Sequence, residues 1–341
     1  MFAWMKYKLR ESLLLSRIVI AILGSPADHL AIHNSAVSKK HITDGFLSEL
    51  AGKYYSQDIS LVYPAPQTGL VQLSALFLAF IVFIVPVIWM RRVIVVVLKR
   101  SRPSLRSVLV FCDAHLSGFV LCLALKDLDV ATATLQHGLY RSDDKGSVMA
   151  LSNFVADRIF LWDEITRAEF IDFGVESSRI EITGSYGFGF LKHRRCIPVD
   201  KHLIYLCPSY HIRSVEYFIR LHNHIPSTFV VQYSLHPILQ TKFQLLNSRP
   251  LNVATPRPMV AICGDSAVIM DSLALGIPVI TVGERKLASV HLSLDQPQPS
   301  EEDWAEFIRE ARNNLDEDRR RFGFSLITDS SIYSNDREAS A

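Results

Sequence analysis

SVLVFCDAHLSGFVLCLALKDLDVATATLQHG, residues 107–138, contains two short apolar runs separated by a longer apolar segment. The first run, residues 107–115, is rich in β-branched residues and ends in polar ones, which is typical of a buried strand. Residues 118–128 form a predicted helix, and ATATLQHG, residues 131–138, forms the next predicted strand. A strand, a helix and a second strand in this order predict parallel neighbours in one α/β sheet.

The same alternation continues beyond this stretch. DRIFLW (157–162) is a predicted strand, DEITRAEFIDFG (163–174) a helix that ends at a glycine, and SRIEITG (178–184) another strand. The following segment, 185–200, is rich in glycine and basic residues, as linkers often are. A second series then begins, with predicted strands at 202–209, 228–237, 259–266 and 277–283 and a helix at 267–276.

Two such series in 341 residues predict two Rossmann-like, doubly wound parallel-sheet domains. The predicted divisions are a basic N-terminal region (1–106), the remainder of the N-terminal domain (107–190), a C-terminal domain (200–328) and a disordered tail (329–341). Ligands of such sheets bind outside the carboxyl ends of the strands. The polar residues that follow residues 107–112 and 131–135 therefore become candidates for a site.

Charge is distributed unevenly along the chain. Residues 1–106 contain 13 Lys and Arg against 5 Asp and Glu, whereas residues 107–341 contain 23 against 29. A basic N-terminal third indicates a surface that meets anionic lipid or polymer. No basic motif interleaved with aromatic residues points to nucleic acid. The five cysteines form no Cys-x-x-Cys pair, which favours reduced thiols and argues against a zinc site.

Residues 70–90, LVQLSALFLAFIVFIVPVIWM, contain no charge and are followed at once by Arg91 and Arg92. This length is sufficient to cross a bilayer as a helix, and the basic flank would hold the following part of the chain in the cytoplasm. Two alternatives are insertion into one leaflet and a buried core helix followed by the strand VIVVVL (93–98). The expected location is the cytoplasmic face of a bacterial inner membrane, with the protein either peripheral or crossing once.

The order of the motifs in the first series resembles the two-domain GT-B glycosyltransferases and the non-hydrolysing UDP-N-acetylglucosamine 2-epimerases. Where the epimerases have Gly-Asp-Thr after a strand, this chain has Cys112-Asp113-Ala114. Their next strand ends in Glu-Ala-Gly-Leu-Arg, and here Gln136-His137-Gly138-Leu139 follows, with Arg141 shifted by one position. Their linker strand ends in Thr-Gly-Asn, and here it ends in Thr183-Gly184-Ser185.

The second series continues the resemblance. The family His-Pro is met by His236-Pro237, and the donor-helix motif Asp-Ser-Gly-Gly-x-x-Glu-Glu begins as Asp265-Ser266, with Asp271 and Ser272 in the places of the two glutamates. The chain is also similar to bacterial sialyltransferases and CDP-glycerol glycerophosphotransferases. The resemblance covers roughly residues 107–283. It implies a GT-B fold in which two Rossmann-like domains face a cleft, with an acceptor-side N-terminal domain and a nucleotide-sugar-binding C-terminal domain.

The departures from the epimerase pattern favour a transfer reaction. Gln136 stands where the epimerases have a catalytic glutamate and cannot take a proton, and Ser272 replaces the second donor glutamate. The glycine- and arginine-containing loop after the first epimerase strand is absent. Because epimerisation by elimination needs proton transfer on both sides of the departing nucleotide, loss of a carboxylate argues against it. The Gln-His-Gly form is associated with polysaccharide transferases.

Candidate donor-binding residues lie in the second series. Ser266 precedes a predicted helix whose first N–H groups favour phosphate, and Asp271 follows where a carboxylate could accept ribose hydroxyl bonds. The alternative is an N-cap serine with an exposed helix aspartate. Gly264 is expected to permit close approach of the donor. His236 would donate to a phosphate, or else it is an ordinary turn residue.

The N-terminal domain supplies the candidates for chemistry. Asp113 at a strand end would remove the acceptor hydroxyl proton, with His115 as a rival base, unless Asp113 is only a turn residue. His137, also assigned to the catalytic group, would line the cleft. A further group would orient the acceptor or the phosphates: His115, Gln136, Gly138 and Arg141.

These observations lead to one main functional expectation and several alternatives. The main expectation is a glycosyltransferase, inverting at the anomeric carbon, that moves a sugar from a nucleotide-sugar donor to a glycan or lipid-linked glycan of a bacterial surface polysaccharide at the membrane. The alternatives are a CDP-glycerol-type glycerophosphotransferase, an epimerase-like enzyme, and a non-catalytic membrane-associated scaffold. No DxD-type metal motif with supporting context is present, so no metal and no cofactor are expected.

Overall fold

The computed structural model describes residues 2–32, 59–62, 70–110, 113–136, 138–140, 145–184, 197–209, 211–240, 242–244, 246, 248–251, 256–284, 286–294, 299–322 and 324. The chain divides into two compact units, Met1–Thr183 and Gly184–Ala341. Each unit contains one sheet in which every pairing is parallel. The predicted tail after residue 328 lies outside the described residues.

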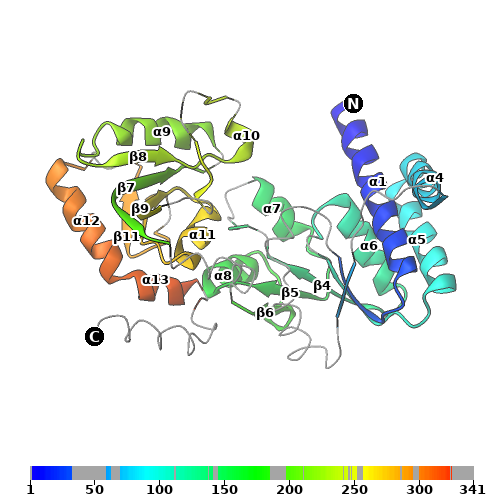
Figure 1. Ribbon diagram of the computed structural model, residues 1–341. Coiled ribbons are helices and arrows are strands. Elements are labelled where there is room, and N and C mark those ends of the chain that lie inside the picture. Colours follow the sequence, from blue (N-terminus) through cyan, green and yellow to red (C-terminus); the bar gives the residue numbers. More distant parts are fainter. Residues whose placement is uncertain are drawn as a thin grey trace. The chain divides into compact units, whose positions relative to one another are not determined.

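The sheet of the first unit has the strand order β2-β1-β3-β4-β5-β6 (Figure 1). Its strands are β1 (His29–Ile32), β2 (Ser60–Val62), β3 (Ser107–Val110), β4 (Ala131–Leu135), β5 (Arg158–Leu161) and β6 (Ile180–Ile182). Every residue of β3 is buried, because a parallel sheet is covered on both faces and its strands are apolar along their whole length. The predicted alternation of strands and helices over 107–184 is confirmed.

Helices α6 (Leu116–Lys126), α7 (Lys145–Ser152) and α8 (Glu164–Asp172) connect the strands from β3 onward. The first residue before α8, Asp163, caps that helix by accepting a hydrogen bond from the Thr166 N–H at 2.8 Å. After α8 the backbone of Gly174 has a φ of 88°, which a glycine adopts without strain. The predicted glycine stop of this helix is therefore confirmed.

Residues 70–90 do not form one continuous helix. Helix α4 (Leu70–Ile84) ends before Pro86, and helix α5 (Val87–Ser101) begins after it. The alternative that made residues 93–98 a strand is wrong, because they lie inside α5 and place Ile94 and Leu98 on its buried side. Over the part of the chain that the structure describes, no helix combines the length and the apolar character needed to cross a membrane.

The basic region 1–106 supplies part of the first unit. It provides β1 and β2 to the sheet, together with α4, α5 and the long helix α1 (Phe2–Gly24), which packs against α4, α5 and α6. Buried Glu11 of α1 accepts hydrogen bonds from the Ser117 N–H at 3.3 Å and the Ser117 hydroxyl at 2.7 Å, and the Tyr7 hydroxyl accepts from the Leu116 N–H at 3.2 Å. Side chains of α1 thus satisfy N–H groups that the first turn of α6 leaves open.

The second unit has a five-stranded sheet in the order β11-β10-β9-β7-β8. Its elements are β7 (Val199–Cys207), α9 (Ile212–His222), β8 (Val230–Tyr233), α10 (Pro237–Gln240), β9 (Arg257–Cys263), α11 (Val268–Ala274), β10 (Val279–Gly283), β11 (Val290–Ser293), α12 (Glu301–Asn313) and α13 (Leu315–Arg321). The four predicted strands and the predicted helix at 267–276 are all present, and β11 is an additional strand.

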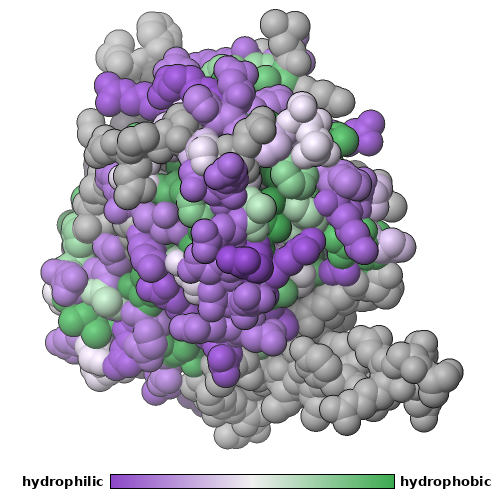
Figure 2. All heavy atoms as spheres, turned by 90° about the vertical axis from the view of Figure 1, so that its left-hand side faces the viewer, coloured by the Kyte–Doolittle hydropathy of each residue, from purple (hydrophilic) through white to green (hydrophobic). Residues whose placement is uncertain are grey.

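Helix α12 shows how this unit presents its outer surface. Its Ser300–Asp303 capping box begins the helix, and its buried Trp304 donates from Nε1 to the His224 carbonyl at 2.7 Å. The opposite face of α12 is charged. The side of the molecule that carries α12 in Figure 1 is covered mainly by hydrophilic residues in Figure 2, as expected for an apolar core with a solvated exterior.

Candidate functional site

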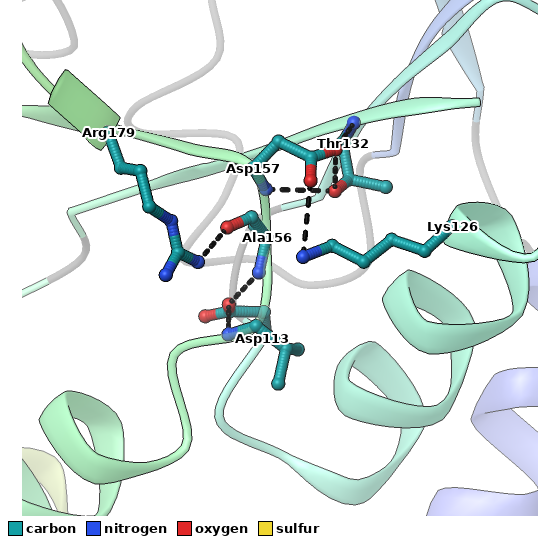
Figure 3. Close-up of polar contacts among 7 residues, drawn as sticks. Asp113, Lys126, Thr132, Ala156, Asp157 and Arg179 are labelled. Carbon is teal, nitrogen blue, oxygen red and sulfur yellow. Dashed lines mark hydrogen bonds and ion pairs between the residues drawn. The ribbon is translucent and has the colours of Figure 1, made fainter. Parts of the chain in front are cut away.

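Asp113, the predicted base, is buried at 4% exposure. Its Oδ2 atom accepts hydrogen bonds from the backbone N–H groups of Val155 and Ala156, each at 2.9 Å (Figure 3). Burial raises the pKa of the Asp113 carboxyl, and these backbone bonds and the charge of Arg179 oppose that rise. Asp113 therefore holds the segment that leads into β5, and its role as a base stays a prediction.

Asp157 forms a second set of polar contacts beside Asp113, which was not predicted from the sequence. The Asp157 Oδ2 atom accepts from the Thr132 N–H and from its hydroxyl, both at 2.8 Å, and its Oδ1 lies 3.1 Å from the Lys126 Nζ. On the other side, Arg179 donates to the Ala156 carbonyl (Figure 3). Its guanidinium also lies over the ring of Phe154. These bonds join the start of β4, the end of α6 and the entry to β5.

Gln136, directly after β4, is also buried and fully engaged. Its Nε2 donates to the Gly138 carbonyl at 2.9 Å and to the Thr166 hydroxyl at 3.0 Å, and its Oε1 accepts from the Trp162 N–H at 2.7 Å. The amide thus connects the carboxyl ends of β4 and β5 to the start of α8. In this position it orients the backbone at Gly138, and any contact with an acceptor or phosphate stays a prediction.

The first unit contains four further candidate residues, of which the structure describes two, Gly138 and His115. Among the described residues, no atom lies within 4 Å of a Cβ atom added to Gly138, so none of them requires a glycine there. His115 occupies the N-cap position of α6 without capping it, and its Nδ1 is buried with no hydrogen-bond partner among the described residues. His137 and Arg141 lie outside the described residues.

In the second unit, the carboxyl ends of β7 and β9 approach each other closely. A Cβ atom added to Gly264, directly after β9, would lie 2.8 Å from the Ser209 backbone nitrogen. The Ser209 N–H donates to the Ser214 hydroxyl of α9 at 3.0 Å. Gly264 is therefore required for the close packing of two chain segments. The expectation that Gly264 serves the approach of a donor stays a prediction beside this structural role.

The loop after β9 brings further polar residues to the same edge of the sheet. The Ser266 hydroxyl accepts from the Val268 N–H at 3.4 Å, so Ser266 lies two residues before α11. A Cβ atom on Gly283, at the end of β10, would lie 3.1 Å from the Asp265 Oδ1. Asp265 therefore extends toward the end of β10.

Asp271 lies in the first turn of α11 and is buried, which corrects the alternative of an exposed helix aspartate. Burial raises the pKa of the Cys207 thiol well above its usual value, and Cys263 and the Asp271 charge raise it further. Asp271 thus lies close to the ends of β7 and β9. Ser272, in the place of the second family glutamate, donates to the Val268 carbonyl at 2.9 Å and so supports its own helix.

His236 follows β8 and precedes α10, and it is exposed at the surface of the second unit. The protein around its ring displaces part of the water, which lowers the pKa of His236 below its usual value. A neutral imidazole can donate one hydrogen bond and accept another. Among the described residues, no group of three or more His, Cys, Asp or Glu is arranged to hold a metal ion.

No protein-family model and no curated protein matches this chain. Solved structures do match. Anabaena Alr3699/HepE in complex with UDP has a TM-score of 0.51 at 10% identity, over 92% of this chain and 100% of that chain. The apo form of the lipopolysaccharide outer core galactosyltransferase WaaB has a TM-score of 0.50 at 10% identity, over 90% and 99%.

A UDP-N-acetylglucosamine 2-epimerase is similar at a TM-score of 0.49 and 12% identity, over 87% of this chain and 91% of that chain. At sequence identities this low, the similarity shows the fold alone. The two parallel-sheet α/β domains are those of a GT-B protein, as the order of the sequence motifs predicted.

Proposed function

We propose that this chain is a glycosyltransferase that takes a sugar from a nucleotide-sugar donor and adds it to a glycan of the bacterial cell surface. One observation carries the proposal: β8 and β9 of a GT-B carboxy-terminal sheet end in His236 and in the Gly264–Ser266 loop, and Asp271 follows in α11. Parallel α/β sheets bind their ligands beyond the carboxyl ends of the strands. The structurally similar HepE is described in complex with UDP.

In this proposal, the second unit binds the donor. Asp271 would accept hydrogen bonds from ribose hydroxyls, and His236 and Ser266 would contact the diphosphate. The buried position of Asp271 supports a strong bond to a hydroxyl donor, because little water competes for its oxygens. The base would come from the first unit, where burial raises the pKa of Asp113 and so makes its carboxylate a better proton acceptor.

The environment of Gln136 supports transfer over epimerisation. Its amide oxygen and nitrogen are all committed to Trp162, Gly138 and Thr166, and an amide does not exchange the proton that a catalytic carboxylate would. An epimerase-like reaction would need a different acid–base group at this position.

The test is binding and slow hydrolysis of UDP-, CMP-, CDP- and GDP-linked donors by the purified full chain. One nucleotide should bind, and Asp271→Ala should weaken that binding by roughly 1–3 kcal/mol in calorimetry, since it removes hydrogen bonds to a charged acceptor. His236→Ala should weaken diphosphate donors more than the free nucleoside. Asp316→Asn, a matched change at an exposed aspartate of α13, should have no effect.

Two results would count against the proposal. If no donor binds or is hydrolysed, a non-catalytic GT-B scaffold is the better description. If a donor binds and Asp271→Ala leaves its affinity unchanged, the ribose contact is assigned to the wrong residue. Release of CMP from CDP-glycerol, with no turnover of the nucleotide sugars, would instead favour glycerophosphate transfer.

A further inference from the structure

The three helices at the amino-terminal side of the first unit expose a large apolar surface. Twelve large hydrophobic side chains on α1, α4 and α5 are exposed, whereas elsewhere in the described residues such side chains are few and scattered. We call them the helical face: Trp4, Met5, Leu9, Leu73, Leu76, Phe77, Phe80, Ile84, Val87, Ile88, Trp89 and Val96. Many large apolar side chains exposed on neighbouring helices mark an interaction surface.

Helix α4 is oriented with its large side chains toward the outside. It buries Ala75 and Ala79, two small residues one turn apart, in a helix that packs against α1. Phe77 and Phe80 on the other side are 68% and 61% exposed. A helix of a water-exposed domain normally buries its largest apolar residues. The small residues allow close packing on α1. The aromatic side of α4 is therefore exposed because of how this helix packs.

The helical face continues from α4 to the start of α1 and to the bend between α4 and α5. The Lys8 Nζ of α1 donates to the Val85 carbonyl at 3.0 Å. The same Nζ lies 5.4 Å from the centre of the Trp4 ring and 5.5 Å from that of Phe83. The three helices also pack on one another (Figure 1). Trp4 and the bend between α4 and α5 therefore lie close together on neighbouring helices.

Positive charge accompanies this apolar surface. Helices α1, α4 and α5 carry eight Lys and Arg residues, and their one acidic residue, Glu11, is buried against α6. Two of the eight are in ion pairs, Arg10 with Glu11 and Arg91 with Asp127 at the end of α6. On α5, the Arg92 guanidinium lies 4.8 Å from the centre of the Trp89 ring. Tryptophan beside basic residues is the combination that places a helix at the boundary between lipid headgroups and acyl chains.

We infer that the helical face binds the surface of an anionic phospholipid bilayer, with the apolar residues of α4 and of the α4–α5 bend inserted among the headgroups. The positive charge favours an anionic bilayer over a second copy of this chain as the binding partner. A second copy of the same surface would oppose basic residues to basic residues with no exposed acidic partner on these helices, whereas anionic lipid complements them. The inference goes beyond the proposed transfer reaction and does not depend on it.

The experiment is co-sedimentation of the purified full chain with vesicles. The wild type should bind vesicles of phosphatidylethanolamine and phosphatidylglycerol more tightly than vesicles of phosphatidylcholine, and added salt should weaken the binding. The double variant Phe77→Glu/Phe80→Glu should bind about tenfold or more weakly. Arg92→Glu/Lys99→Glu should lose only the preference for the anionic vesicles.

A matched control carries two new carboxylates on the other unit. Ile212→Glu/Val230→Glu changes side chains that are 43% and 60% exposed, and it should bind vesicles like the wild type. Circular dichroism and thermal unfolding of each variant establish that it is folded. Equal vesicle binding by the two glutamate doubles would overturn the inference. So would loss of a dimer, in light scattering without lipid, as the only effect of Phe77→Glu/Phe80→Glu.

Discussion

The carboxyl ends of the two sheets use their polar residues in different ways. At the first sheet, Asp113 and Gln136 direct their side chains to backbone groups of the segments around β5. At the second sheet, the closest packing is between backbones at Gly264 and Ser209, and Asp271 is buried in a short helix. Polar residues at the end of a sheet can thus support the fold through side-chain bonds to the backbone, as at the first sheet, or lie beside a close backbone contact, as at the second. Their partner atoms distinguish these uses.

The largest expected effect concerns Asp113 at the first sheet. Asp113→Ala would leave the N–H groups of Val155 and Ala156 without their acceptor, so we expect the free energy of unfolding to fall by about 2–5 kcal/mol. Asp113→Asn keeps an oxygen in place and should fold with a small loss. Urea denaturation of the three proteins measures these differences.

Turnover then separates the two uses of Asp113. If it is the base, Asp113→Asn should lower turnover by about 10²–10⁴-fold with donor affinity nearly unchanged. Near-normal turnover of folded Asp113→Asn, together with loss of turnover in His115→Ala or His137→Ala, would show that the base is a histidine. The first sheet would then contain an aspartate with a purely structural role.

An intermediate effect is expected from two glycines, one at each sheet. Gly264→Ala forces a methyl group against the Ser209 nitrogen, and we expect a loss of about 1–3 kcal/mol in stability. The methyl group of Gly138→Ala meets none of the described residues, and this substitution should change stability by less than about 0.5 kcal/mol. Thermal unfolding of both variants tests this contrast.

The Gly138→Ala protein also reports on the site. Because the substitution leaves the fold intact, any large fall in turnover would mean that substrate approaches the backbone at this position. Normal turnover would remove Gly138 from the site. Equal destabilisation by both substitutions would contradict the difference between the two sheets.

The smallest effect concerns pH. Burial raises the pKa of Asp113 in the folded protein, so the folded state binds a proton more readily than the unfolded chain does. The contribution of this group to the free energy of unfolding is fully present below the pKa of an unfolded aspartate, near 4. It is lost as the pH rises through the higher pKa of the folded state. The free energy of unfolding then falls by at most about 1.4 kcal/mol per pH unit. Compared with Asp113→Asn, the wild type should lose stability over this range. A stability difference independent of pH would contradict the assigned direction.

Much of the fold could be predicted because buried parallel strands are unbroken apolar runs. The strands β1 and β2 were missed since they have four and three residues and lie in a polar, basic region. Residues 93–98 have the composition of a strand, but their buried positions recur every four residues, as in a helix. The composition of VIVVVL therefore favoured the wrong alternative.

The candidate site was less predictable. The positions of Asp113 and Gln136 at strand ends followed from the sequence. Apart from Gly138, which lies two residues after Gln136, their hydrogen-bond partners are 26 to 43 residues away along the chain. No local pattern encodes such distant contacts. The bonds of Asp157 to Thr132, 25 residues apart, had no sequence signal for the same reason.

The bonds between Glu11 and Ser117 also have a consequence for synthesis on the ribosome. They join residues 106 positions apart, so at 5–20 residues per second roughly 5–20 s separate the emergence of α1 from that of its partner. During that interval α1, whose apolar side includes the buried Leu15, Val19 and Ile22, has no α6 to pack against. The amino-terminal unit therefore completes its folding late, and a nascent chain that ends before residue 126 presents this apolar side to chaperones.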